Sequence, residues 1–212
     1  MEVAGAYRWR ATGRDGVPAA DVSQLYTREL FAFDESFAPV LAQGLELGRS
    51  FVQPKYWGRR SLDYLWHGIG AYLKTRPDIR YLFGPVSISQ AYPPHALAML
   101  VYFYSLYFPA RSHAATARLP YRIDNERQRE LAQLFSAGNY AADFRQLKEQ
   151  LQAMGLTVPT LYKQYTELCE PGGVAFLDFN IDPAFSNYVD GLVVVDLQHV
   201  KASRLNRYMG AA

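Results

Sequence analysis

The segment of residues 45–62 constrains the fold more than any other part of the sequence. Its first part, residues 45–52, has the mostly apolar composition that predicts a β-strand. A loop containing Gly58 follows, and then a helix for which Ser61 is the expected N-cap. Glycine allows a ligand to approach the backbone closely, and a helix N-terminus attracts phosphate. The segment therefore predicts either a phosphate-binding strand–loop–helix unit or an ordinary connection with surface arginines.

Two opposite charges interrupt this apolar strand. Glu46 and Arg49 lie within it, although burying a charge is costly unless the charge is paired or used chemically. Strand side chains alternate between two faces, so regular geometry would point these two residues in opposite directions. A β-bulge at Gly48 would bring both to one face and would leave backbone N–H groups free to meet a ligand.

The residues of this segment resemble the central motif of the GNAT acyltransferase superfamily. The residues that carry this resemblance are Val52, Pro54, Tyr56, Gly58, Leu62 and Leu65. More narrowly, residues 46–52 are similar to the ornithine N-acyltransferases of lipid synthesis and their hemolysin-like relatives. The Glu-x-x-Arg spacing is also similar to that of the acyl-homoserine-lactone synthases. Further matching stretches are residues 5–8, 81–89 and 178–196, so the resemblance extends from residue 5 to about residue 210.

The resemblance implies an α/β (α+β) fold with a mixed, mostly antiparallel sheet flanked by helices. We expect residues 1–212 to form one acyltransferase domain with a helical insertion at about residues 124–170. In the resembled family, further helices and strands precede the element that begins this chain. We therefore expect the N-terminal part of the family fold to be missing, and the chain to be its C-terminal portion.

The activity implied is transfer of a fatty acyl group to the amine of a small amino acid such as ornithine or glycine, in aminolipid synthesis. The donor would be acyl carrier protein or acyl-CoA, and no separate cofactor or metal is implied. Glu46 would take the proton of the amine. Arg49 would hold Glu46 or bind the carboxylate of the acceptor, a task that Arg8 would share.

The resemblance also assigns residues to the donor. Bulge amides at residues 48–51 would stabilise the thioester oxyanion, and the loop would bind the pantetheine phosphate. The expected substrate-binding residues are Arg8, Ser50, Phe51, Val52, Tyr56, Gly58, Arg59, Arg60 and Ser87. Relatives that use coenzyme A usually have a small residue where Arg60 stands, which favours acyl carrier protein here.

Other interpretations remain open from the sequence. For Glu46 and Arg49, the alternative to a catalytic role is an ordinary structural ion pair. For Ser87, the alternative to a place in the donor site is a solvated face of its strand. A separate interpretation is that the whole chain is a catalytically silent module that keeps the fold and binds carrier protein or membrane for a partner domain.

Composition narrows the remaining classes. The 212 residues have a net charge of only +2, without the concentrated basic face of a nucleic-acid-binding protein. The single cysteine, Cys169, excludes an internal disulfide and a multi-cysteine zinc site. Residues 97–108 form the longest apolar run, shorter than the roughly 20 residues needed to span a bilayer. We expect a cytoplasmic protein with a peripheral contact at the inner face of the membrane.

The remaining elements follow from periodicity and from turn residues. Strands are expected at residues 2–10, 31–34, 81–89, 174–181 and 192–197, and helices at residues 21–30, 36–42, 62–73, 93–108, 124–138, 140–154 and 159–168. The helix containing residues 97–108 is apolar nearly all round, which indicates a core helix or a wall for an acyl chain. Residues 111–122 are expected to be a loop. The basic residues 201–207 predict a solvated face, or a contact with an acidic carrier protein or anionic lipid.

Overall fold

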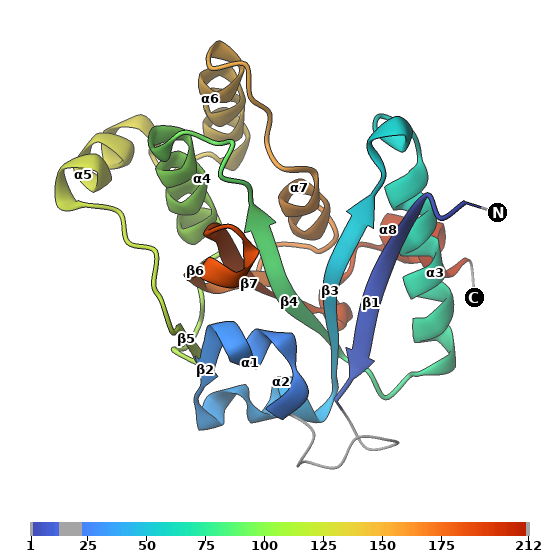
Figure 1. Cartoon of the computed structure of the whole chain (residues 1–212). Coiled ribbons are helices and arrows are strands. Elements are labelled where there is room, and N and C mark those ends of the chain that lie inside the picture. The colour runs from blue at the N-terminus through green and yellow to red at the C-terminus, as the bar shows by residue number, and fades with distance from the viewer. Residues whose placement is uncertain (1, 13–22, 211–212) are drawn as a thin grey trace.

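A five-stranded sheet runs through the computed structural model, which describes residues 2–12 and 23–210 (Figure 1). Its strand order is β1-β3-β4-β7-β6. These strands span, in that order, Gly5–Ala11, Gly44–Val52, Tyr81–Ile88, Tyr188–Asp196 and Val174–Asp182. Strands β3 and β4 run parallel, whereas the other three neighbouring pairs of this sheet are antiparallel. The predicted mixed, mostly antiparallel sheet is therefore confirmed.

The helices and a small ribbon cover both faces of the sheet (Figure 1). Alternation along β4 divides the core, because Leu82 joins the large cluster on one face and Phe83 joins a smaller cluster on the other. The large cluster contains residues of α3 (Ser61–Thr75), α4 (Pro94–Tyr107), α6 (Tyr140–Ala153) and α7 (Thr160–Thr166). The opposite face carries α1 (Tyr26–Leu30), α2 (Ala38–Ala42) and the ribbon of β2 (Phe31–Phe33) with β5 (Ala115–Ala117).

Other elements in the described residues are α5 (Asn125–Leu134), α8 (Ala202–Met209) and single-turn 3₁₀ segments at Glu35–Phe37, Pro54–Tyr56, Pro183–Phe185 and Leu197–His199. Helices α5 to α7 fall within the predicted helical insertion. Helix α4 is a core helix, since Met99, Leu100 and Phe103 are fully buried. None of the helices in the described ranges has an apolar stretch long enough to cross a bilayer.

Two predictions about helix ends are wrong. Ser61 is the first residue of α3 and not its cap; Arg60 holds the N-cap position, and no side chain there bonds to the helix. The Ser61 hydroxyl instead donates to the Tyr56 carbonyl at 3.4 Å. Asp124 does cap α5 as expected, by accepting from the Arg127 N–H. That helix ends at Leu134 and not near residue 138, because Phe135 adopts extended dihedral angles.

Two further expectations need correction. Residues 111–122 are not loop throughout, because Ala115–Ala117 pairs with β2 as β5. The basic terminal segment is not simply a solvated face. It forms α8, where Arg207 binds Asp63 at 2.8 Å and Arg204 lies 3.3 Å from Glu167.

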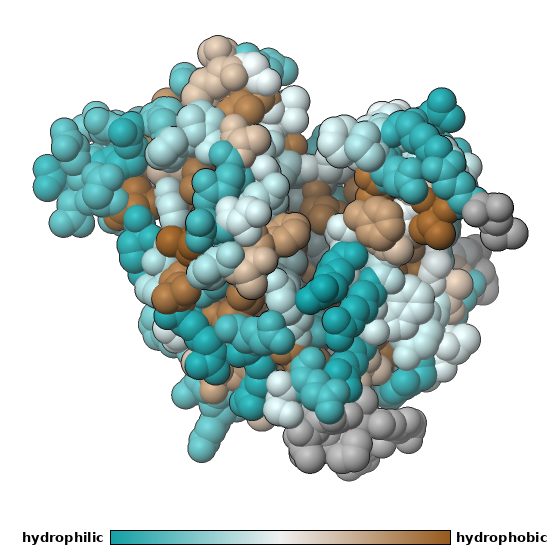
Figure 2. Space-filling model, viewed as in Figure 1, coloured by the Kyte–Doolittle hydropathy of each residue, from teal (hydrophilic) through white to brown (hydrophobic). Residues whose placement is uncertain are grey.

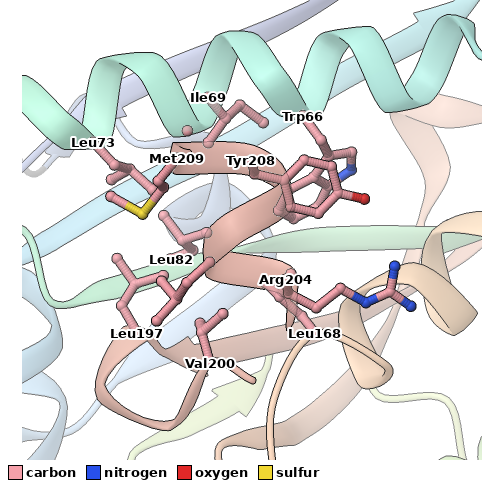
Figure 3. A pocket seen from close by; sticks show the side chains of 12 residues that line it. Trp66, Ile69, Leu73, Leu82, Leu168, Leu197, Val200, Arg204, Tyr208 and Met209 are labelled. Carbon is pink, nitrogen blue, oxygen red and sulfur yellow. The ribbon is translucent and has the colours of Figure 1, made fainter. Parts of the chain in front are cut away.

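Helix α8 packs closely against α3, as Figure 3 shows for the side chains of Trp66, Ile69 and Leu73 beside Tyr208 and Met209. A Cβ atom on Gly70 would lie 2.2 Å from the Tyr208 carbonyl oxygen, so this contact requires glycine. The space left between the helices is only about 30 Å³. We therefore regard it as a packing seam and not as a ligand site.

Candidate functional site

A β-bulge in β3 brings the two strand charges to one face. Ala6 pairs with Phe51 and Arg8 pairs with Gly48, so two residues of β3 oppose one residue of β1. The bulge is centred on Arg49, whose φ is +48°, next to the glycine that the sequence indicated. Glu46 and Arg49 consequently line the same small pocket. The predicted bulge and its effect on the two charges are confirmed.

Helix α1 holds the Glu46 carboxylate. Glu46 is 5% exposed, and its Oε1 accepts hydrogen bonds from the Thr27 N–H at 2.8 Å and the Thr27 hydroxyl at 2.7 Å. Within the described residues, Glu46 and Arg49 form no ion pair. The structural pair considered from the sequence is therefore not formed, and Thr27 satisfies the buried carboxylate instead.

Two guanidinium groups lie at the mouth of the same pocket. The Arg49 guanidinium lies 5.1 Å from the centre of the Tyr26 ring, close enough for a cation–π contact. Arg8 lies on the neighbouring strand β1 and lines the pocket with Trp9 and Tyr26. Arg8, which the sequence analysis expected to share the task of Arg49, thus lines the same pocket as Arg49. The pocket is small, about 10 Å³, and combines one buried carboxylate with two cations.

An open groove lies at the far end of β3. Strands β3 and β4 pair from Gly44 and Tyr81 only as far as Glu46 and Phe83, although both strands continue beyond these residues. The surface view shows a hollow where the loop before α3 faces the start of α7 (Figure 2). The groove has a volume of about 480 Å³ and is bounded by the end of β3, the loop before α3, and residues 157–161 at the start of α7. The pairing of β3 with β4 therefore ends before either strand does.

The loop before α3 gives the groove one of its walls. Gly58 has φ of +70°, a conformation that other residues adopt at a cost. Trp57 donates its indole N–H to the Val52 carbonyl at 2.8 Å, which ties the loop to the end of β3. Trp57 and Phe51 are 69% and 50% exposed, so the groove offers uncovered apolar surface.

Most residues predicted for the donor meet in this groove. Those that line it are Ser50, Phe51, Val52, Tyr56, Gly58 and Arg59. Two predicted residues are absent from its lining in the described part of the chain. The Arg60 guanidinium lies 3.3 Å from the Asp63 carboxylate, and the Ser87 hydroxyl donates to Asp190 at 2.5 Å.

The sequence analysis missed a buried acidic cluster behind Tyr26. Asp182 and Asp190 are 2% and 1% exposed, and the Tyr26 hydroxyl donates to the Asp182 carboxylate. Burial raises the pKa of Asp190 to about 6; the Ser87 hydrogen bond opposes this rise and the charge of Asp182 adds to it. Burial and the bond to Asp182 also raise the pKa of Tyr26. The available signal was the presence of two aspartates in otherwise apolar strands.

Comparison with known protein families identifies a relationship for the part of the chain that contains the bulge. A model described as "Acetyltransferase (GNAT) domain" matches residues 1–67, which include both the bulge and the groove loop. Residues 1–67 belong to the GNAT superfamily. The GNAT resemblance and the GNAT-like fold predicted from the sequence are thus confirmed.

The similar curated proteins are named as N-acyltransferases. A "Glycine N(alpha)-acyltransferase" of Bacteroides thetaiotaomicron is 30% identical over 79% of this chain and 52% of its own length. One of the same name from Phocaeicola vulgatus is 28% identical over 79% of this chain and 53% of its own length. An "L-ornithine N(alpha)-acyltransferase" of Brucella abortus is 45% identical over 26% of this chain and 20% of its own length.

These matches also allow the length of the chain to be compared with that of its relatives. It spans about half the length of the glycine acyltransferases that it matches. No solved structure matches the chain with statistical significance.

Proposed function

We propose that this chain transfers a fatty acyl group from a thioester donor to the α-amine of a small amino acid. The observation that carries the proposal is the position of the two cavities at the two ends of one strand. A small pocket is lined by the Glu46 carboxylate and the guanidinium groups of Arg8 and Arg49, and an open groove begins at Ser50. One cavity suits a zwitterionic acceptor and the other suits a long donor. Residues 1–212 would act as a single acyltransferase domain.

In the acceptor pocket, Glu46 takes a proton from the ammonium group of the amino acid, which leaves a nucleophilic amine. Arg49 and Arg8 bind the carboxylate of the same molecule, because a guanidinium group matches carboxylate geometry. The pocket of about 10 Å³ has room for no more than a water molecule, so the amino acid would lie at its opening, against the exposed Arg8 and Arg49. Two of the similar curated proteins are named for glycine. We therefore propose glycine before ornithine.

The chemical step joins the two cavities. The amine nitrogen attacks the thioester carbon, and the oxyanion that forms is stabilised by backbone N–H groups of the bulge at residues 48–51. The C–N bond forms and the C–S bond breaks. As the intermediate collapses, the nitrogen loses a second proton to solvent, and the proton taken by Glu46 passes to the departing thiolate. The products are an N-acyl amino acid, a free thiol and one released proton.

In the donor groove, Ser50, Phe51, Val52 and Tyr56 contact the pantetheine arm and the acyl chain. Gly58 and Arg59 bind its phosphate, with Arg60 beside them. The bulky, basic loop favours acyl carrier protein over acyl-CoA, since the carrier's arm has a single phosphate. The product is an amphiphile, so we propose a role in aminolipid synthesis by a cytoplasmic protein that contacts the inner face of the membrane.

The test is single-turnover acyl transfer with long-chain acyl carrier protein and acyl-CoA as donors. Glycine, ornithine and other amino acids serve as acceptors. We expect N-acylglycine from the wild-type chain and a loss of about a hundredfold or more in Glu46→Gln, which removes the base. Binding of carrier protein without turnover would instead favour a silent recruitment module, and full activity of Glu46→Gln would remove Glu46 from the mechanism.

A further inference from the structure

We infer that Tyr26 and Thr27 of helix α1 are positioning residues for the acceptor half of the reaction. This inference rests on the proposed function. The two residues are adjacent in sequence and contact two of the three charged groups of the acceptor pocket, Tyr26 at Arg49 and Thr27 at Glu46. A single short helix thus fixes the relative placement of the base and of the group that binds the acceptor's carboxylate.

Thr27 acts on one oxygen of Glu46. Its N–H and its hydroxyl both donate to Oε1, at 2.8 Å and 2.7 Å, and Thr27 is fully buried. Hydrogen bonds to a charged acceptor are about twice as strong as neutral ones. With Oε1 engaged twice, the side chain of Glu46 is held in one orientation, and Oε2 is the oxygen that meets the acceptor's ammonium group. Because Arg49 makes no ion pair with Glu46 among the described residues, Thr27 supplies this orientation.

Tyr26 acts on Arg49 by a longer route. Its ring lies 5.1 Å from the Arg49 guanidinium carbon, and its hydroxyl donates to the Asp182 carboxylate. Asp182 is itself fixed, since its Oδ1 accepts from the N–H groups of Ala184 and Phe185 at 2.9 Å and 3.2 Å. The ring is therefore anchored to the β6–β7 turn and gives the exposed Arg49 a fixed surface.

The two contacts predict different kinetic effects. Loss of the Thr27 hydroxyl bond disorders the base, which acts in the chemical step, so kcat falls. Loss of the Tyr26 anchor loosens the group that binds the acceptor's carboxylate, so KM for the amino acid rises. A purely structural role for α1 would instead lower the amount of folded protein and leave both constants of the folded fraction unchanged.

The first test compares Thr27→Val with Thr27→Ser in the full chain. We expect kcat to fall about tenfold in Thr27→Val, with KM for glycine within about twofold, as the loss of one charge-assisted bond predicts. Thr27→Ser keeps the hydroxyl and should restore kcat. The deficit of Thr27→Val should shrink at alkaline pH, where more of the acceptor amine is already neutral. Equal kcat in Thr27→Val and wild type would overturn the inference.

The second test is Tyr26→Phe, which keeps the ring and removes the bond to Asp182. We expect KM for glycine to rise about fivefold with kcat nearly unchanged, and thermal unfolding verifies that each variant is folded. An unchanged KM would overturn the role of Tyr26. The wild-type chain is measured in the same assay. Absence of turnover there would overturn the proposed function together with this inference, whereas wild-type turnover with unaffected variants would overturn the inference alone.

Discussion

Glu46 and Phe51 belong to the same strand, but the first is 5% exposed and the second is 50% exposed. The pocket around Glu46 is closed by specific side-chain contacts from α1, a helix on one face of the sheet. The groove around Phe51 is open and owes its shape to the backbone, because two strands separate there and a glycine turn follows. Side-chain changes should therefore act on the pocket, and backbone changes on the groove.

The largest expected effect is at the point where the two strands separate. A Cβ atom on Gly84 would lie 1.9 Å from the Leu47 carbonyl oxygen, so Gly84→Ala must push β4 away from β3. We expect the free energy of unfolding to fall by about 3 kcal/mol, as for other overpacked sites. Urea denaturation measures this loss.

The matched control for this change is Gly48→Ala in the same region of β3. A Cβ atom there meets nothing within 4 Å. Its free energy of unfolding should stay within about 1 kcal/mol of wild type, since alanine only stiffens the strand. If both variants lose the same free energy of unfolding, the close contact between Gly84 and Leu47 is not what makes this part of the sheet sensitive to substitution.

The second effect tests the backbone of the groove loop. Gly58→Ala places a side chain on a residue with φ of +70°, which should lower the free energy of unfolding by about 1–2 kcal/mol. The strained loop should also raise KM for the acyl donor. The control is Gly68→Ala, at a glycine within α3. A Cβ atom meets nothing within 4 Å at either Gly58 or Gly68, so the two variants differ only in backbone conformation. Gly68→Ala should stabilise the protein by about 0.5–1 kcal/mol, so the two variants should differ in sign.

The third effect is the pH dependence of stability that arises from the buried acidic cluster behind Tyr26. Burial raises the pKa of Asp190 to about 6 from an ordinary value of 3.8. The folded state therefore binds this proton more tightly than the unfolded state, and the resulting stability is present below pH 3.8 and is lost as pH rises through 6. From pH 5 to pH 7.5, wild type should lose about 1 kcal/mol more than Asp190→Asn, which does not titrate.

Chemical denaturation of both proteins at the two pH values measures this difference. Asp34 offers a contrast on the surface, because hydrogen bonds from Ser36 lower its pKa. Asp34→Asn should leave the pH dependence between pH 5 and pH 7.5 unchanged, because this carboxyl is ionised in both the folded and the unfolded state over that range. An identical pH dependence of wild type and Asp190→Asn would contradict the raised pKa.

These two regions also differ in how far the sequence predicts them. The bulge follows from two charges beside a glycine within an apolar strand, and most of the groove follows from the local stretch of residues 50–59. Thr27 could not be assigned to Glu46, because the contact depends on how α1 packs over the sheet. The bond between Tyr26 and Asp182 joins residues 156 positions apart, so no local pattern contains it.

Ser87 shows the same limit on a smaller scale. Its alternation with apolar neighbours in β4 predicts that it faces away from the core, and it is indeed exposed. The pattern does not reveal the partner strand. Asp190 of β7 pairs directly with Ser87 and accepts a hydrogen bond from its hydroxyl, so this serine belongs to the buried acidic cluster and not to the groove lining.

The smallest expected effect tests whether the open groove binds an acyl chain. Phe51 lines the groove and is 50% exposed, so Phe51→Ser should leave the free energy of unfolding within about 0.5 kcal/mol. A bound long-chain donor would cover part of the ring, so KM for a long-chain donor should rise about threefold. KM for a short-chain donor should not change. Leu119 is 51% exposed and lies outside the groove lining in the described residues, so Leu119→Ser is the matched control. If both variants raise KM alike, or if chain length makes no difference for Phe51→Ser, the acyl chain lies elsewhere.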